Sequence, residues 1–340
     1  MIYRFMFLPF LYSLFISIPS LALERPPQFI ALSFDNCAEL DRWENLKAFT
    51  DEMNQNGPNV HFTFFVSGTN FIAQKNHNSY QGPRHKVGAA NIDFSANDEE
   101  INQRLGFMHS LHDSGNELAS HAIGHFDGRN WNHNDWMSEL SRFSVLFLNA
   151  FTQAGFLDAK ELTDHIKGFR APYLSTSPAL YPVLKELGYR YDTSNSGDRT
   201  LWPTQDKNDL WRFNLASLKI AETGIKTLSM DYNFYVRQAH GEHEIPKMAE
   251  AFQRQMLETY LNYFQENYYG NRAPLHIGHH FFPYQQGIYH LALQKFAREV
   301  CFLPEVRCVS NSELADFLDL AGASTLKSYQ SGDFTKMPRN

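Results

Sequence analysis

The amino-acid sequence predicts an α/β fold in which about seven to eight mostly parallel strands curl into a (β/α) barrel. Two observations support this prediction. Strand-like apolar runs alternate with helical patterns along most of the chain, and polar segments rich in catalytic residue types directly follow the strands. Such alternation is typical of right-handed β-α-β units, and catalytic groups in these barrels gather at the carboxyl ends of the strands.

The expected elements follow one another in a regular order. Strands are predicted over residues 29–34, 60–66, 116–120, 168–170, 189–191, 227–231, 274–279 and 307–310. Helices are predicted over residues 40–53, 98–113, 134–154, 177–187, 246–268, 286–300 and 311–320. Residues 76–93 and 194–210 are polar and irregular, as expected of loops around a substrate mouth. Residues 321–340 contain few apolar side chains, which predicts a disordered tail.

The first residues have the pattern of a secretory signal peptide. Arg4 precedes a run of apolar residues, and a small-x-small cleavage signal ends at Ala22. An uncleaved anchor helix is the alternative, but the run is short for a membrane span and contains Pro9. We therefore expect a signal peptide over 1–22 and one secreted or periplasmic domain over 23–320, with no membrane span in the mature protein.

Composition narrows the classes of partner. The formal net charge is −7 and no basic cluster occurs, which argues against nucleic acid or an anionic membrane surface. An aromatic content of 15% is compatible with carbohydrate contacts, although most of these rings are expected in the core. Cys301 and Cys308 bracket a short loop and could form a disulfide in an oxidising compartment. Cys37 is expected to be a small buried hydrophobic residue.

His121 and His125 are candidate metal ligands. They lie four residues apart directly after the strand predicted over 116–120, so both imidazoles can turn toward one divalent ion. The spacing alone is weak evidence, because the chain has 15 histidines and His276 and His280 repeat it. The position at a strand end distinguishes the first pair.

Asp35 and Arg170 are candidates for a catalytic carboxylate and its partner. Asp35 ends an apolar strand, where a carboxylate is costly unless it is paired or functional. A turn or helix-capping aspartate is the simpler alternative. A guanidinium from Arg170 would keep Asp35 ionised and in one rotamer. Pro172 then fixes a turn that could direct the backbone amide of Tyr173 at an oxyanion.

The last histidine segment offers a candidate general acid. His280 follows the strand predicted over 274–279 and could protonate a leaving amine, while Asp231, on the preceding strand, could orient its ring. His279 is the rival. Adjacent residues on a strand point to opposite faces, so only one of the two rings can face the mouth of the barrel.

Together these segments resemble the polysaccharide deacetylases, carbohydrate esterase family 4, over residues 29–318. The matching segments are Ser33-Phe34-Asp35-Asn36 for the family's Thr-Phe-Asp-Asp, His121 to His125 for His-Ser/Thr-x-x-His, Arg170 to Tyr173 for Arg-x-Pro-Tyr, and Asp231 for the aspartate that tunes the acid. The resemblance implies the family's distorted barrel and a divalent metal, zinc first, with cobalt, manganese or nickel as alternatives. It implies the metal ligands His121, His125 and Asn36, with Asp35 as the base.

Three further segments are similar to the insect-type chitin deacetylases: Asp135-Trp136, Leu201-Trp202-Pro203 and Asn271-Arg272-Ala273-Pro274-Leu275. Alignment on the last of these makes His280 the acid, whereas the shorter pattern Leu-x-Leu-x-His selects His279. We follow the longer match. The resemblance also suggests that Trp202 flanks the acetyl methyl group, and a core tryptophan is the alternative.

Asn36 departs from the family pattern. The family has a metal-binding aspartate there, so the amide removes one negative charge and predicts weaker metal binding. Asp127 could supply a replacement carboxylate, although a solvated turn is the simpler role.

The predicted function is a secreted metal-dependent deacetylase acting on N-acetyl or O-acetyl groups of a glycan, such as chitin or another N-acetylglucosamine polymer. One alternative is a catalytically impaired relative that only binds glycan, because Asn36 weakens the metal site. A second is a glycoside hydrolase, which would need two carboxylates flanking the glycosidic bond.

Overall fold

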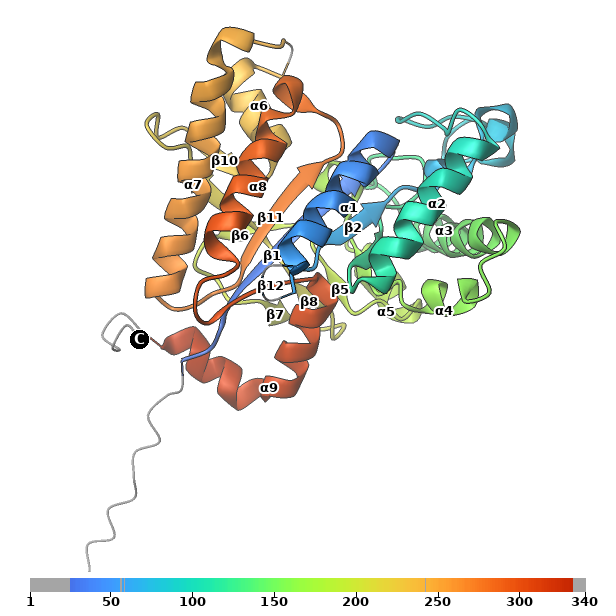
Figure 1. Ribbon diagram of the computed structural model, residues 1–340. Coiled ribbons are helices and arrows are strands. Elements are labelled where there is room, and N and C mark those ends of the chain that lie inside the picture. The colour runs from blue at the N-terminus through green and yellow to red at the C-terminus, as the bar shows by residue number, and fades with distance from the viewer. Residues whose placement is uncertain (1–24, 56, 58, 242, 333–340) are drawn as a thin grey trace, which may run out of the picture.

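The computed structural model describes residues 25–332 except positions 56, 58 and 242 (Figure 1). Its main sheet has the strand order β11-β1-β2-β3-β4-β5-β8-β7, and β12 also pairs with β1. Every pairing in this sheet is parallel except that of β7 with β8. The strands are β1 (Gln28–Asn36), β2 (Thr63–Val66), β3 (Glu117–Ser120), β4 (Gly168–Phe169), β5 (Tyr191–Asp192), β7 (Thr204–Gln205), β8 (Trp211–Arg212), β11 (Leu275–His280) and β12 (Val306–Val309).

A smaller sheet links the two sides of the main one. It consists of β6 (Ser196–Asp198), β9 (Leu215–Lys219) and β10 (Lys226–Leu228) in the order β10-β9-β6. The N–H of Ser229 donates to the carbonyl of Ala216, and the N–H of Gly278 on β11 donates to the carbonyl of Ser229, each at 2.9 Å. The strands therefore surround a common interior, and the predicted distorted (β/α) barrel is confirmed.

Helices cover the outer face of the sheet, and α1, α2 and α8 lie side by side in front of it in Figure 1. The helices are α1 (Leu40–Gln55), α2 (Asp98–Asp113), α3 (His133–Gln153), α4 (Ala159–Asp164), α5 (Leu180–Glu186), α6 (Asp231–Ala239), α7 (Ala249–Tyr269), α8 (Ile288–Val300) and α9 (Asn311–Ser331). Local sequence explains several starts. Asn132 and Asp135 form a capping box at α3, and Ser310 and Glu313 form one at α9.

Strand alternation divides the apolar residues between two cores. Phe34 and its neighbours point outward against the helices, where the rings of Trp43 and Phe281 lie 4.8 Å apart. Phe65, Tyr191 and other inward-facing residues form a second cluster, together with apolar side chains of α9. The interior of the barrel is therefore filled rather than open, and only its polar carboxyl end is left for chemistry.

Helix α9 contradicts one expectation from the sequence. It continues to Ser331, with a bend at Gly322 (φ 72°), so the prediction of disorder from residue 321 is wrong as far as 331. The buried side chain of Leu326 anchors this second half under the amino end of the barrel. The remaining tail residues, 333–340, and the expected signal peptide over 1–22 lie outside the described residues.

Two shorter segments also differ from expectation. Residues 194–210, expected as an irregular loop, contain β6 and β7, because their polar residues pair through the backbone rather than through a buried face. The strand expected over 227–231 is β10, and it is antiparallel to β9. Asp231 consequently stands at the start of α6 rather than on a strand.

The cysteines behave as the sequence suggests. Cys301 and Cys308 form a disulfide, with their Cα atoms 5.6 Å apart, which ties the end of α8 to β12. Cys37 is fully buried, and its thiol lies 3.5 Å from the carbonyl oxygen of Phe34. Within the described part of the chain, every helix is too short or too polar to cross a membrane.

Candidate active site

Strand register brings the predicted site residues together at one end of the barrel. Asp35 pairs with His280 across β1 and β11. The residues that precede His121 and Arg170 pair across β3 and β4. Since parallel strands place their carboxyl ends at one edge, these groups converge although they are far apart in sequence.

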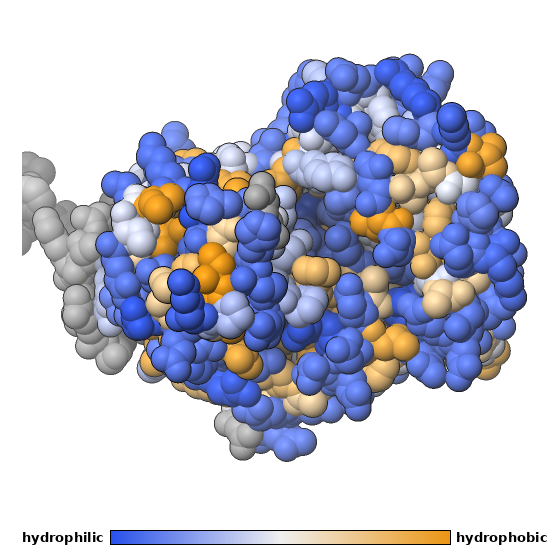
Figure 2. Space-filling view, turned by 90° about the horizontal axis from the view of Figure 1, so that it is seen from above, coloured by the Kyte–Doolittle hydropathy of each residue, from blue (hydrophilic) through white to orange (hydrophobic). Residues whose placement is uncertain are grey.

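They line a cavity of about 340 Å³. Figure 2, viewed onto this end, shows the surface hollowed near its middle. The lining residues are Asp35, Asn36, His121, His125, Ala171, Tyr173, Leu174, Met230, Tyr232, Asn233, His280 and Tyr284.

Arg170 holds the Asp35 carboxylate in place. Its Nη1 donates to Asp35 Oδ1 at 2.6 Å, its Nη2 to Ser33 Oγ at 3.0 Å and its Nε to Thr193 Oγ1 at 2.8 Å. The guanidinium also lies over the ring of Phe65, 4.3 Å from its centroid. Burial alone would raise the pKa of Asp35, but the charges of Arg170 and nearby histidines outweigh it and the pKa is lowered. Asp35 is therefore a fixed, ionised base at neutral pH.

His121 and His125 are both prepared to act as neutral ligands. His121 Nδ1 lies 2.8 Å from the carbonyl oxygen of Arg170, so this nitrogen must carry the proton and Nε2 is left with a free lone pair. The rings are 5.2 Å apart. Burial lowers the pKa of His121 to about 4 and that of His125 to about 3, so both imidazoles are uncharged at neutral pH.

The donor set fits a divalent transition metal. His125 Nδ1 is buried without a hydrogen-bond partner among the described residues, and an unpaired buried nitrogen is costly unless a ligand satisfies it. Asn36 also lines the cavity, and its Oδ1 is 3.5 Å from Ser67 Oγ, at the outer limit of a hydrogen bond. Two imidazoles and an amide oxygen would make an open coordination site. Asp127 is exposed, pairs with Arg129 at 3.2 Å and does not line the cavity.

His280 and Asp231 form a second charged pair at the cavity. His280 Nδ1 donates to Asp231 Oδ1 at 2.7 Å, and the backbone N–H of His280 donates to Oδ2 at 2.9 Å. Burial alone would lower the pKa of His280, but the Asp231 carboxylate reverses this and the pKa is raised. Burial would raise the pKa of Asp231, yet the two histidines beside it lower that pKa to about 2. The Asp231 carboxylate thus extends the pH range over which His280 stays protonated.

His279 lies on the opposite face of β11. Its side chain is fully buried, and its Nε2 is 3.1 Å from the hydroxyl of Tyr260. Its ring also packs edge-on against Phe34 in the outer core. The structure therefore puts His280, and not His279, at the cavity.

Four of the lining residues have a left-handed backbone although none is glycine: Asn36, His125, Tyr173 and Leu174, with φ between 54° and 68°. Such conformations cost about 1–3 kcal/mol each when the residue does not favour them, and they persist only where the surroundings enforce them. Tyr173 is 57% exposed, and the edge of its ring contacts His125 with 4.6 Å between centroids. Strained backbone concentrated around one cavity supports a functional role for it.

Trp202 does not reach this site. Its Nε1 donates to the carbonyl of Asn271 at 2.9 Å, and its ring stacks on Tyr329 of α9 in the inner core. The expectation that Trp202 flanks the substrate is corrected, because the loop that carries it runs toward the amino end of the barrel. Sequence reasoning missed Tyr232 and Tyr284, which do line the cavity. Tyr232 could have been predicted from the sequence, because it directly follows the candidate residue Asp231.

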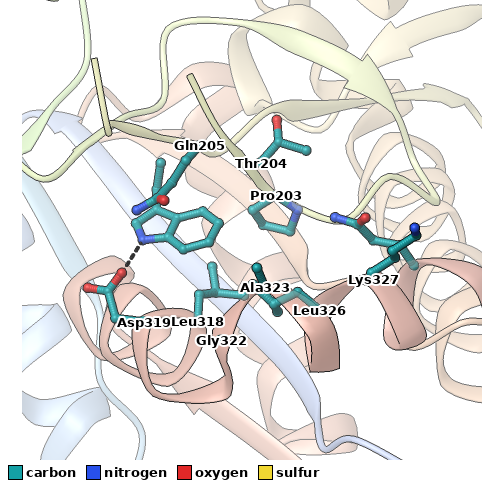
Figure 3. Close-up of a pocket in the computed structure, with 11 residues that line it drawn as sticks. Pro203, Thr204, Gln205, Leu318, Asp319, Gly322, Ala323, Leu326 and Lys327 are labelled. Carbon is teal, nitrogen blue, oxygen red and sulfur yellow. Dashed lines mark hydrogen bonds between the residues drawn. The ribbon is translucent and has the colours of Figure 1, made fainter. Parts of the chain in front are cut away.

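A second cleft lies at the amino end of the barrel. It separates α9 from β7 and β8, has a volume of about 390 Å³ and shares no lining residue with the cavity at the carboxyl end (Figure 3). Trp211 Nε1 donates to Asp319 Oδ1 across it at 2.8 Å. The cleft is a boundary between α9 and the sheet and contains no predicted site residue.

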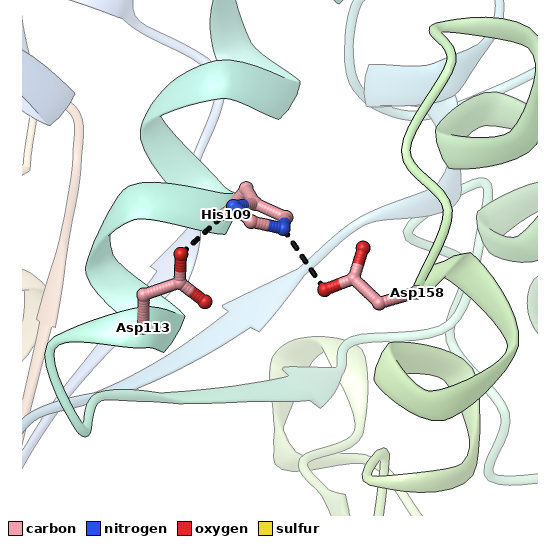
Figure 4. A group of neighbouring side chains, drawn as sticks. All are labelled: His109, Asp113 and Asp158. Carbon is pink, nitrogen blue, oxygen red and sulfur yellow. Dashed lines mark hydrogen bonds and ion pairs between the residues drawn. The ribbon is translucent and has the colours of Figure 1, made fainter.

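His109, Asp113 and Asp158 form a group that could hold a cation by distance alone (Figure 4). Nε2 of His109 lies 2.9 Å from Asp158, and Nδ1 lies 3.1 Å from Asp113. The carboxylates therefore face opposite nitrogens of one ring, whereas an imidazole offers a single nitrogen to an ion. We interpret the group as a hydrogen-bonded bridge between α2 and the start of α4.

The fold and the cavity define a (β/α)-barrel protein with its candidate active site at the carboxyl ends of the strands. The sequence model of the family described as polysaccharide deacetylase matches residues 22–191, half of the chain. The protein belongs to this family. The match does not include the segment of residues 271–275, so the insect-type resemblance stays a prediction.

Solved structures agree on the fold. A Mycobacterium smegmatis protein assigned as a polysaccharide deacetylase is 17% identical with a TM-score of 0.54, over 88% of this chain and 95% of that one. A Pseudomonas aeruginosa PAO1 protein with the same assignment is 14% identical with a TM-score of 0.51, over 85% and 89%. Puue allantoinase is 12% identical with a TM-score of 0.50, over 85% and 88%. No curated protein matches the sequence. The different name of the last structure shows that the fold alone does not identify a substrate.

Proposed function

We propose that the protein is a metal-dependent deacetylase that hydrolyses acetyl groups, N-acetyl groups first, on a glycan. One observation carries the proposal. The same cavity holds an ionised Asp35 fixed by Arg170, a His280 whose protonated form is stabilised by Asp231, and two neutral histidines suited to a metal. A base and an acid with opposite pKa shifts are what amide hydrolysis requires.

Each residue has a defined part in the reaction. When bound, the metal would act as a Lewis acid that polarises the acetyl carbonyl and makes a water more acidic. Asp35 accepts the proton of the attacking water as its oxygen bonds to the acetyl carbon. The backbone N–H of Tyr173 stabilises the oxyanion. His280 donates a proton from Nε2 to the amine nitrogen as the C–N bond breaks, which yields acetate and a free amine.

The substrate proposal rests on the wall of the cavity. Tyr173, Tyr232 and Tyr284 line it, and the first two are 57% and 44% exposed. Flat apolar rings beside polar groups suit the mixed faces of a sugar. Together with the insect-type resemblance, these tyrosine rings favour chitin or another N-acetylglucosamine polymer as the substrate. O-acetylated glycans are the alternative substrate.

Secretion or a periplasmic location is part of the same proposal. The pattern of a signal peptide over 1–22 is its first support. The Cys301–Cys308 disulfide is its second, since such bonds persist mainly in oxidising compartments.

A catalytically impaired glycan-binding protein is the second candidate. It is favoured by Asn36, whose neutral oxygen is a poorer ligand than a carboxylate. A glycoside hydrolase has less support, because Asp35 is the only carboxylate that lines the described cavity, whereas Asp231 is buried behind His280. Retaining and inverting glycosidases use two.

The test is acetate release. The metal-depleted protein is supplied with zinc, cobalt, manganese or nickel, and acetate is measured on chitin oligosaccharides and on O-acetylated xylan. We expect metal-dependent acetate release from the wild type and none from Asp35→Asn, which preserves volume but cannot accept the proton. Glycan binding without acetate release would support the impaired relative, and new reducing ends would support the glycosidase.

A further inference from the structure

The loop between the two proposed metal ligands has an unusual backbone. Ala122 and His125 are both left-handed, with φ of 58° and 54°, so residues 121–125 do not form a helical turn. In a helix a spacing of four residues would align the rings without assistance. Here the convergence of His121 and His125 depends on an irregular conformation that other parts of the chain must stabilise.

The carbonyl groups of this loop are held by two neighbouring segments. The oxygens of residues 122, 123 and 124 accept hydrogen bonds from the backbone N–H groups of Gly68, Thr69 and Asn91, at 2.9, 3.3 and 2.8 Å. These contacts fix one side of the loop. The N–H groups of residues 122–124 also need acceptors, because these residues are buried. That of Ala122 donates to Ser120 Oγ at 3.3 Å, which leaves those of Ile123 and Gly124.

Glu139 supplies that acceptor. It projects from α3, is 1% exposed, and its Oε1 accepts from the N–H of Ile123 at 3.0 Å and from that of Gly124 at 3.2 Å. The hydroxyl of Tyr80 lies 2.9 and 3.0 Å from its two oxygens. A Cβ atom at Gly124 would stand 2.6 Å from the Tyr80 hydroxyl oxygen, so the packing around this carboxylate leaves no spare room.

We propose that Glu139 is a positioning residue that holds the His121–His125 loop in the conformation that binds the metal. This inference rests on the proposed function. Glu139 touches neither the cavity nor the ligand rings, and it acts through the two backbone N–H groups that lie between them. Partners of this kind orient ligands, and their loss typically weakens metal binding by about 10–100-fold.

Glu117 provides a matched control at the other end of the barrel. It is also a buried carboxylate, 7% exposed, and it accepts from the Tyr191 hydroxyl at 2.7 Å and the Thr63 hydroxyl at 2.9 Å. A backbone N–H, that of Ser312, donates to it at 2.9 Å as well. It has no contact with the His121–His125 loop. A purely structural buried glutamate should behave like Glu117.

The experiment compares zinc affinity across matched variants, measured by titration of the metal-depleted full chain, with thermal unfolding recorded in parallel. Glu139→Gln keeps an acceptor oxygen and should lose less than about threefold in affinity. Glu139→Met keeps length and volume but removes the acceptor, and should bind zinc about 10–100-fold more weakly. Glu117→Met should lower the Tm while its zinc affinity stays that of the wild type.

The outcomes are separable. Equal zinc affinity in Glu139→Met and Glu139→Gln would overturn this inference alone, and so would equal losses in Glu139→Met and Glu117→Met. If the unaltered chain binds none of zinc, cobalt, manganese and nickel, the proposed function and this inference are overturned together. If Glu139→Met does not fold, Glu139→Asp takes its place, because it retains the charge but is one methylene too short to reach both N–H groups.

Discussion

Buried polar side chains at the two ends of the barrel differ in how completely their hydrogen bonds are satisfied. At the amino end, the oxygens of Glu117 are fully paired with partners from β2, β5 and α9, and α9 covers the opening. At the carboxyl end, His125 has a buried nitrogen without a partner among the described residues, and it and three other left-handed residues line one cavity. At the amino end, the left-handed Arg272 and the unpaired Oδ1 of Asn311 line neither cleft. One continuous sheet connects the two ends. The difference in hydrogen bonding and backbone conformation therefore comes from the loops before and after the strands.

This difference separates stability from function. A fully paired polar cluster lowers the free energy of the folded state and specifies its packing. Unpaired atoms and strained backbone raise that free energy, and where several of them line one cavity, binding of a ligand there explains why they are retained. The comparison predicts that substitutions at the carboxyl end change metal binding and rate more than the Tm, and that the amino end shows the reverse.

The largest effect is expected from His121→Ala and His125→Ala. Each removes a proposed ligand, so metal content and acetate release should both be abolished while the fold persists. Metal analysis, activity and thermal unfolding of both variants test this. Full metal content in either variant would show that its histidine is not a ligand.

His280→Ala should come next. Loss of a positioned general acid lowers the rate by about 10²–10⁴-fold, and bound metal should be preserved. His279→Ala removes a fully buried ring that packs on Tyr260, so it should lower the Tm and affect the rate little. If His279→Ala were the inactive variant, the assignment of the acid would be wrong by one residue.

Asn36→Asp should act in the opposite direction. It adds an anionic oxygen at a position that already lines the cavity, and zinc affinity should rise by about tenfold or more. Activity should rise with it if metal retention limits the reaction. Zinc titration and acetate release are measured side by side, with Asn36→Ala as the control that loses the oxygen. Unchanged affinity in Asn36→Asp would place residue 36 outside the coordination sphere.

The pH dependence of kcat/KM should have two limbs. Activity needs Asp35 ionised, and its pKa lies below the ordinary 3.8, so the rate falls only in strong acid. It also needs His280 protonated, and its pKa lies above the ordinary 6.5, so the rate falls again as pH rises through that higher value. Asp231→Asn removes the raising charge, and the alkaline limb should move to lower pH. If the alkaline limb of the profile does not move, Asp231 does not control the pKa of the general acid.

The smallest effect is expected from Trp202→Phe. A smaller aromatic ring replaces the indole and the hydrogen bond to Asn271 is lost, which should cost about 1–3 kcal/mol of stability. Because Trp202 lies in the inner core beside α9, kcat/KM should be unchanged. A clear loss of activity at unchanged stability would return this residue to the substrate site.

The sequence was sufficient for the fold and for half of the residues that line the cavity, because the ends of strands can be recognised from local sequence. Asp35, His121, Arg170 and His280 each directly follow a short apolar run, and parallel strands bring such positions to one edge. The alternation rule also placed His279 and His280 on opposite faces. Both the strand-end positions and the opposite orientation of His279 and His280 follow from residues that are adjacent in the sequence.

Other features depend on partners that the sequence does not indicate. Trp202 stacks on Tyr329, and α9 is stabilised under the barrel by apolar residues spaced too widely to predict its second half. Tyr284 reaches the cavity through an irregular turn after β11. Glu139 sits in the middle of a helix, and its role appears only when the backbone hydrogen bonds of a distant loop are accounted for.

The described chain enters and leaves on the side of the barrel opposite the cavity. Arg25 donates a hydrogen bond to the carbonyl of Tyr268 at the end of α7, and α9 ends at Ser331 on the same side (Figure 1). A protein attached to a bead or a cell wall through either end would therefore turn the candidate active site away from the support. If the proposed function holds, a layer of protein attached in this way keeps every cavity accessible to an insoluble glycan.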